Sequence, residues 1–192
     1  RSRGNALIAV YDKANPNAED AKVLWSWHLW CTAVPQIIEF TVPKTGNKYI
    51  MMDRNLGATT TGPALGTTQG LHYQWGRKDP FPGTKGFGDN TPKPVYVYDA
   101  GGSPEKYIEY ISKQTDGINL MYSLQHPDQI IYALDESEES DWYTTNTQEY
   151  ANNQLWSADK KTIFDPCPAG WRVPDNEAFD RDGDGVTDLI YN

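Results

Sequence analysis

Apolar and polar positions alternate along Lys22–Cys31, and a period of two residues is typical of a β-strand whose two faces differ. One face of this strand would carry Val23, Trp25, Trp27, Leu29 and Cys31. The other face would carry Leu24, Ser26, His28 and Trp30. Because the first face is strongly apolar, we expect Trp25, Trp27 and Leu29 to be more buried than Ser26 and His28.

Three further strands are expected in the first 53 residues. Ala6–Tyr11 is a short apolar run that predicts a buried strand. Ile38, Phe40 and Val42 alternate with polar residues, and the turn-forming Lys44–Asn47 separates them from Lys48–Asp53. This arrangement predicts a β-hairpin.

The middle of the chain is richer in glycine, proline and threonine, and it predicts long loops at Leu56–Gly70 and Arg77–Pro104. Within them, Val95–Tyr98 favours a short strand. Leu71–Gly76 is compatible with either a helix or a strand. Pro104–Lys113 predicts a helix, since proline stands at its start and Ile108 and Ile111 fall on one face.

Asp128–Leu134 indicates one more short element. Together the elements predict a single α+β domain over residues 1–192. It would be rich in strands, with an antiparallel sheet, long irregular loops and few short helices.

The stretch Lys161–Pro174 reads KTIFDPCPAGWRVP and cannot be helical, because Pro166, Pro168 and Pro174 lack the main-chain donor and restrict the backbone. We expect an extended, sharply turned segment that anchors Trp171 in a core. Two upstream segments have a similar character, namely MDRNLGAT from Met52 and GLHYQWGRKDPFP from Gly70.

In this order the three motifs resemble a domain of Bacteroidetes surface proteins related to the Fibrobacter succinogenes major paralogous domain. The matching positions are Asn55-Leu56, Gly70, Tyr73, Trp75, Cys167-Pro168 and Gly170–Pro174, with Leu24–Trp30 upstream. The resemblance covers roughly residues 5 to 175. It implies a module at the end of a fimbrial or outer-membrane-anchored protein, outside the cell. The Trp-Arg-Val-Pro step is also similar to C-type-lectin-like and formylglycine-generating-enzyme-like folds, an analogy of fold alone.

Charge and composition narrow the partners. The net charge is −9, so the chain has no basic stripe for nucleic acid and little attraction to an anionic membrane surface. No apolar run reaches membrane-spanning length. Seven Trp and twelve Tyr are many for this length, and such rings fill cores or stack on sugars. Because no leader precedes Arg1, we interpret the chain as a fragment of a longer one.

The C-terminal residues 180–191 resemble a calcium-binding loop. Oxygen ligands would come from Asp180, Asp182, Asp184, the Val186 carbonyl and Asp188, with Gly185 at the sharp turn. Hard oxygen ligands suit Ca²⁺, and Tyr191 replaces the usual bidentate ligand at position 12. We therefore expect weak Ca²⁺ binding.

Other chemistry has little support in the sequence. His28, His72 and His126 share no metal-ligand spacing, and no nucleophile or phosphate-binding motif is present. Cys31 and Cys167 could form one disulfide or remain two thiols. We expect a structural ion pair within Arg77, Lys78 and Asp79, and an exposed ligand-contact surface at Tyr96 and Tyr98.

These features favour a cell-surface adhesion or binding domain without enzymatic activity. It would recognise a glycan or a protein and stand beside other surface or pilus subunits. An accessory carbohydrate-binding module of a polysaccharide-degrading system is the alternative. An enzyme such as a glycoside hydrolase, with a site that no motif marks, is the third.

Overall fold

The computed structural model describes residues 3–62, 67–81, 94–96, 105–107, 109–112, 117–132, 142 and 154–179. The strands of these residues form five two-stranded sheets. Four pairs are antiparallel: β1 (Gly4–Tyr11) with β2 (Val23–Cys31), β3 (Ile37–Thr41) with β4 (Lys48–Met52), β5 (His72–Tyr73) with β6 (Pro80–Phe81), and β7 (Pro94–Tyr96) with β8 (Glu105–Tyr107). The fifth pair, β9 (Glu109–Ser112) with β10 (Gln129–Tyr132), is parallel.

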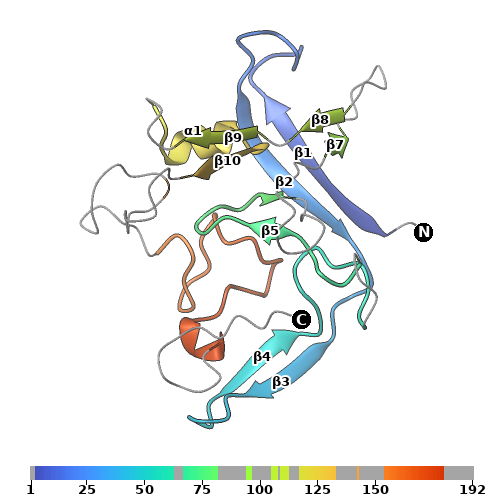
Figure 1. Ribbon diagram of the computed structural model, residues 1–192, viewed down its shortest axis with the longest axis vertical. Helices are drawn as coiled ribbons and strands as arrows, with labels where there is room; N and C mark the ends of the chain where they lie inside the picture. The colour runs from blue at the N-terminus through green and yellow to red at the C-terminus, as the bar shows by residue number, and fades with distance from the viewer. Residues whose placement is uncertain are drawn as a thin grey trace.

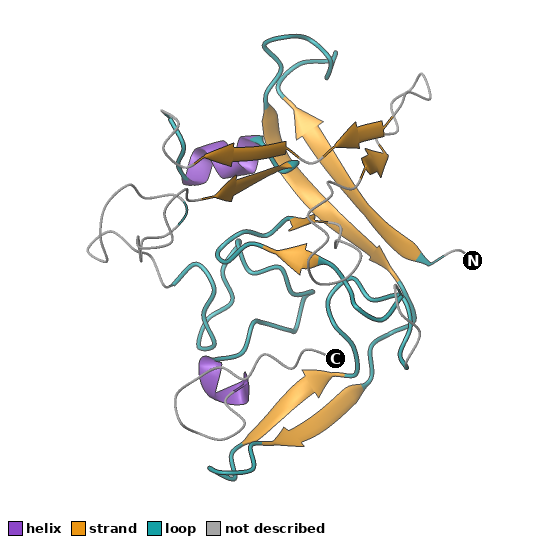
Figure 2. Ribbon diagram, viewed as in Figure 1, coloured by secondary structure: helices purple, strands orange, loops and turns teal. Residues whose placement is uncertain are grey.

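The two longest strands, β1 and β2, form a ribbon at one end of the molecule, and the β3–β4 hairpin lies at the other end (Figure 1). Residues 154–179 and the short strand β5 lie between them (Figure 1). Loops account for much of the described chain, while helix is confined to α1 (Leu120–Gln125) and the 3₁₀ turn Asn176–Phe179 (Figure 2). For the described residues, the prediction of a strand-rich chain with antiparallel pairs and few short helices is confirmed. The described strands form separate ribbons instead of one antiparallel sheet.

The structure confirms the strand predicted over Lys22–Cys31, but from Ser26 to Leu29 the more buried face is the one that carries Ser26 and His28. Ser26 is 1% exposed, whereas Trp27 and Leu29 are each 48% exposed. The Ser26 hydroxyl donates to the buried Asp79 carboxylate, at 2.8 Å, and this bond turns the serine face inward. The expected burial order along β2 is therefore wrong.

Strand β1 confirms the strand predicted over Ala6–Tyr11, but the prediction that it is buried is wrong. Ile8 pairs with Trp27 across the ribbon, and paired residues share a face. Ile8 is 47% exposed and Val10 is 43% exposed. The outer face of the ribbon is thus apolar and in contact with solvent.

The β3–β4 hairpin is confirmed, with Phe40 paired to Tyr49 and the turn before Lys48. It contacts the end of the described chain through polar groups. The Tyr49 hydroxyl donates to Asp175, at 2.8 Å, and lies 3.1 Å from a Glu177 carboxylate oxygen. Asn47 adds a 2.6 Å bond to the same glutamate.

Arg77 joins the β5–β6 turn to α1 and β10. It is 2% exposed, and its guanidinium donates to the main-chain oxygens of Ser123, His126 and Gln129. The guanidinium also lies 5.0 Å from the ring centre of Phe81. Burial lowers the pKa of Arg77 to about 10, so the side chain remains charged at neutral pH. The segment Leu71–Gly76, open between helix and strand, contains the strand β5.

The helix predicted over Pro104–Lys113 is wrong, because the described residues of that range form β8 and β9. Ile111 pairs with Ile131 in the parallel β9–β10 ladder, and this long-range pairing prevails over local helical preference. The element expected within Asp128–Leu134 is confirmed as β10. Ile118, Ile131 and Trp142 form the buried apolar cluster beside it.

Helix α1 was not expected from the sequence. Its N-cap is Asn119, whose side-chain oxygen accepts a bond from the Tyr122 main chain at 2.9 Å. Within the described residues, no helix combines the length and apolar character needed to cross a membrane.

Candidate functional site: a pocket lined by four tryptophans

A pocket of about 580 Å³ lies where β2 meets the proline-rich segment Ile163–Trp171. Its aromatic lining is Trp25, Trp27 and Trp30 from β2 and Trp171 from the opposite wall. The turn after β2 adds Thr32 to Pro35, and Lys78 and Asp79 contribute charged groups. With Leu56, which also lines it, the pocket unites four segments that are far apart in the sequence.

The β2 wall is held in place by bonds to other segments. The Trp30 indole N–H donates to the Ala58 carbonyl, at 2.9 Å. The Lys78 ammonium lies 4.5 Å from the ring centre of Trp25, where the negative face of the indole attracts a cation. Trp27 has no such cover and is half in solvent. Two indoles are thus fixed, while Trp27 stands at the rim.

The opposite wall is organised by Asp165, which is 6% exposed. Its carboxylate accepts main-chain bonds from Cys167, at 2.8 Å, and Val173, at 3.0 Å. The Lys161 ammonium supplies the counter-charge at 2.8 Å. These bonds fold the Pro-Cys-Pro-Ala-Gly-Trp step back on itself.

A tight turn then presents Trp171 to the pocket. The Trp171 N–H donates to the Pro168 carbonyl, at 3.0 Å, and Gly170 has φ of 85°, a conformation that favours glycine. The prediction that Lys161–Pro174 is not helical is confirmed. Trp171 itself is largely but not fully buried and lines the pocket, so the expectation that it is anchored in a core is met in part.

Charged groups form the floor of the pocket, which confirms the predicted ion pair for Lys78 and Asp79. The Lys78 ammonium lies 2.7 and 2.8 Å from the two Asp79 oxygens and also donates to the Ser26 carbonyl, at 3.0 Å. The Lys78 side chain is 8% exposed and that of Asp79 is 2% exposed. Burial lowers the pKa of Lys78, and the charge of Asp79 opposes that shift. Arg77 is bonded elsewhere and takes no part in the pair.

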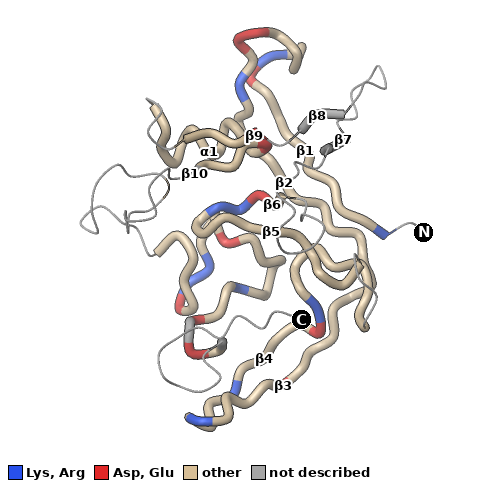
Figure 3. The backbone as a smooth tube through the Cα atoms, viewed as in Figure 1, with Lys and Arg blue, Asp and Glu red and all other residues tan. Residues whose placement is uncertain are grey.

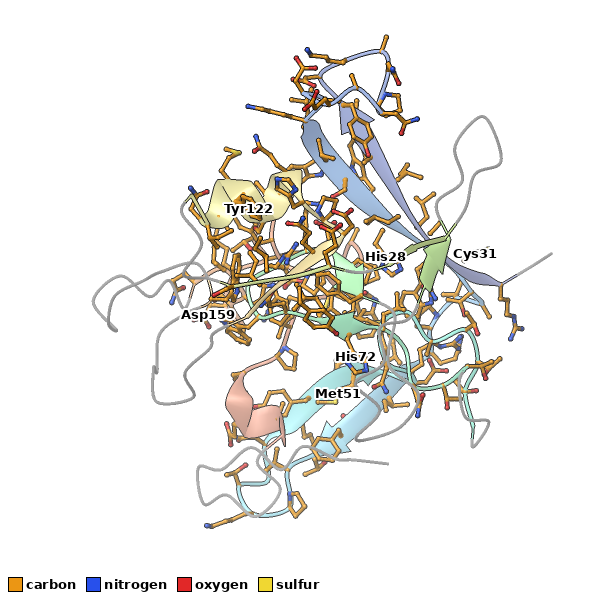
Figure 4. The ribbon with its side chains drawn as sticks, turned by 45° about the horizontal axis from the view of Figure 1, so that its top comes forward. His28, Cys31, Met51, His72, Tyr122 and Asp159 are labelled. Atoms are coloured by element: carbon orange, nitrogen blue, oxygen red, sulfur yellow. The ribbon has the colours of Figure 1, made fainter. Side chains whose placement is uncertain are left out.

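His28 continues the polar floor toward β5. Its ring (labelled in Figure 4) lies between the Asn5 side-chain oxygen, at 2.9 Å from Nε2, and the Tyr73 hydroxyl, at 3.2 Å from Nδ1. Burial lowers the pKa of His28, with the Asp79 charge in opposition. Both ring nitrogens of His28 are therefore used in hydrogen bonds within the protein.

Cys167 lines the same pocket without the character of a reactive thiol. Burial, and then the neighbouring Asp165 carboxylate, raise the pKa of the Cys167 thiol to about 12. The neutral thiol is therefore the form present at neutral pH. Cys31 and Cys167 are not joined by a disulfide.

The ligand-contact and metal-binding side chains named from the sequence lie outside the part of the chain that the structure describes. Of Tyr96 only the main chain, in β7, is described, and Tyr98 lies outside the described residues. The acidic loop of Asp180, Asp182, Asp184, Val186 and Asp188 lies outside them as well. Trp25, Trp27 and Trp171, which line the pocket, were expected to fill the core. Trp75 is 42% exposed and is not among the residues that line the pocket.

Comparisons with known proteins found no match, so the function has to be inferred from the pocket. No family model matches the chain, and searches of curated proteins and of solved structures found no match. What the protein binds must therefore be inferred from its own residues. The pocket contributes stacking surfaces, hydrogen-bonding groups on its floor, and an apolar rim at Val34 and Ile163.

Proposed function

We propose that this chain is a non-enzymatic binding domain of a cell-surface protein and that it holds a glycan in the four-tryptophan pocket. The observation that supports this most is the combination of indole rings and buried hydrogen-bonding groups in one concave site. A pyranose ring has an apolar face that stacks on indole and hydroxyls that pair with polar groups. The volume of the pocket, about 580 Å³, is typical of sites for small ligands, which span roughly 300–1,000 Å³.

A glycan fits this site better than a protein surface does. Protein partners usually meet broad, fairly flat interfaces of about 800 Å² on each side. Here four tryptophans line a cavity together with Ser26, His28 and Asp79. An extended polypeptide could enter such a cavity only with a single side chain. One or two sugar units would fill it and leave the rest of an oligosaccharide in solvent.

Binding without catalysis is supported by the state of the polar side chains. The Ser26 hydroxyl is buried and donates to Asp79, so it does not face a substrate. The Cys167 thiol is protonated at neutral pH because its pKa is raised to about 12. Asp79 and Asp165 each pair with a lysine. A general acid or a nucleophile would need a different setting.

The cellular setting follows from the resemblance to Bacteroidetes surface proteins. We place the domain outside the cell, in a fimbrial or outer-membrane-anchored protein, with other surface or pilus subunits as neighbours. A C-type-lectin-like α+β fold and a Ca²⁺ ion at Asp180–Asp188 belong to the same proposal. An accessory module of a polysaccharide-degrading system would use the same pocket, with a polysaccharide in place of a host or neighbour glycan.

A glycan array probed with the purified chain tests the proposal. We expect binding to a restricted group of glycans and its loss in Trp171→Ala, with the fold checked by circular dichroism. Host-type glycans among the ligands would favour adhesion, and plant or microbial polysaccharides would favour the accessory module. Binding to no glycan, or binding that Trp171→Ala leaves intact, would overturn the pocket as the site. Hydrolysis of a bound glycan would contradict the absence of enzymatic activity.

A further inference from the structure

We infer that the pocket selects an uncharged sugar unit and rejects anionic sugars, and that Lys78 and Asp79 set this preference. The inference rests on the proposed function, since it names the class of glycan that the pocket accepts. It comes from the charges that line the pocket and from the bonds that each of them already makes.

The described lining of the pocket has a net negative charge. Among the described residues that line the pocket, Lys78 is the only lysine or arginine, and Asp79 and Asp165 are the only carboxylates. One positive and two negative charges leave the lining at −1. Burial lowers the pKa of His28, so this ring adds no charge at neutral pH. The chain as a whole carries −9.

The N–H donors of the Lys78 ammonium group are all used within the protein. An ammonium group has three N–H donors. Those of Lys78 face the Ser26 carbonyl, at 3.0 Å, the Ser26 hydroxyl oxygen, at 2.5 Å, and the Asp79 carboxylate, at 2.7 and 2.8 Å. Figure 3 shows the two opposite charges adjacent, directly before β6. The one cation of the lining is therefore saturated within the protein.

The surroundings of Asp165 offer an anionic ligand no counter-charge either. Its partner, Lys161, is not among the residues that line the pocket. The Lys161 ammonium donates to Asp165, at 2.8 Å, and to the Cys167 carbonyl, at 2.6 Å. At the rim, Val34 is 79% exposed and Ile163 is 67% exposed, and both are apolar. Within the described part of the lining, no cation is left for a carboxylate or a sulfate.

The physical consequence is a difference between sugars that share a ring and differ in charge. A carboxylate that enters the pocket loses hydration and gains no counter-ion. A neutral hexose keeps the stacking on Trp27 and Trp171 and carries no charge that would have to lose its hydration. Discrimination arises because the anionic ligand leaves a charge unpaired.

The first test needs only the wild-type chain. Matched conjugates of glucose and glucuronic acid, galactose and galacturonic acid, and mannose and mannuronic acid would be compared at low salt. For the pair whose neutral member binds best, we expect the acidic member to bind at least tenfold more weakly. Acidic conjugates that bind as tightly as neutral ones, in a manner that depends on Trp171, would overturn the inference and leave the proposed function standing. Binding of no sugar would overturn both.

A second test reverses the preference. Asp79→Asn keeps the side-chain volume and removes the counter-charge of Lys78, so an acidic sugar can take its place. We expect the ratio of acidic to neutral binding to rise at least tenfold, whereas Glu39→Gln, in an exposed ion pair on β3, leaves it unchanged. An unchanged ratio in a folded Asp79→Asn variant would refute the role of the ion pair. Tighter binding of tetramethylammonium than of the neutral sugar would show that the pocket is built for cations, and would overturn the inference. If Asp79→Asn does not fold, the wild-type comparison decides.

Discussion

Polar side chains are buried at the floor of the pocket, whereas apolar side chains are exposed on the outer face of the β1–β2 ribbon. Both regions are the reverse of the usual distribution. Ser26, Lys78 and Asp79 are buried and bonded to one another. Trp27 and Leu29, on the same strand as Ser26, stand half in solvent. A strand with both an inward polar face and an outward apolar one is costly unless each face has a use. We assign the polar face to support of the pocket and the indole of Trp27 to contact with ligand.

The buried ion pair offers the largest effect. In Asp79→Ala, Lys78 would lose its counter-charge in a buried site, and such losses cost about 3–5 kcal/mol of unfolding free energy. Urea denaturation measures the change. Its control is Glu39→Ala, which breaks the ion pair with Lys48 on side chains that are 59% and 64% exposed. That pair should contribute less than about 1 kcal/mol. Equal losses in the two variants would mean that the floor is not a buried charged site.

The two faces of β2 can also be tested by matched exchanges. Ser26→Val places an apolar side chain on the inner face and removes the donor to Asp79, at an expected cost of about 1–3 kcal/mol. Leu29→Thr makes the opposite exchange on the outer face and should cost less than about 1 kcal/mol. Denaturant midpoints of the two variants decide the matter. If Ser26→Val were stabilising and Leu29→Thr the more damaging, the faces would be assigned wrongly.

Calcium binding would be a second way in which this chain neutralises carboxylates, besides the lysine pairs of Asp79 and Asp165. Asp79 and Asp165 use lysines, whereas the sequence of residues 180–188 has the spacing of a Ca²⁺ loop. With the weak affinity expected, about 10 mM Ca²⁺ should stabilise the fold by roughly 1–3 kcal/mol. A thermal-shift titration with Asp182→Ala as the control checks this. No shift in the wild type, or the same shift in the mutant, would leave only an acidic segment.

The smallest effect is expected from pH. Burial lowers the pKa of His28 below its ordinary value of 6.5, so the unfolded chain takes up this proton first. The contribution of His28 is complete above pH 6.5 and is lost as the pH falls from 6.5 through the folded-state pKa. The wild type should therefore lose more stability than His28→Gln does between about pH 7 and 5. Equal slopes would show that the imidazole titrates as in the unfolded chain.

Local pattern was sufficient for most strands and insufficient for their faces. Alternation located β2 and the β3–β4 hairpin, because the period of a strand is local. The inward turn of Ser26 depends on Asp79, 53 residues away, and no local pattern contains that bond. The same limit explains the error at Pro104–Lys113, where the pairing of Ile111 with Ile131 selects strand.

The sequence allowed only part of the candidate site to be predicted. The motif around Trp171 and the density of tryptophan in β2 drew attention to the right residues, but hydrophobicity assigned them to a core. The folding of the proline-rich wall depends on Asp165, whose bonds to Cys167 and Val173 are local, so an aspartate before Pro-Cys-Pro was a usable signal. Asn119 likewise marked the start of α1 as an N-cap.

Two exposed tryptophans allow the most direct test of a ligand site in the pocket. Trp27 is 48% exposed and lines the pocket, while Trp75 is 42% exposed and packs at a tilt against Trp156, with the ring centres 4.9 Å apart. The measurement is the calorimetric Kd of each Ala variant for the glycan that the array selects. Loss of an indole stacked on a sugar should weaken binding about tenfold in Trp27→Ala. Trp75→Ala should stay within about twofold of the wild type, because its ring does not line the pocket. Equal Kd values for the wild type and Trp27→Ala, or a larger loss in Trp75→Ala, would contradict the account.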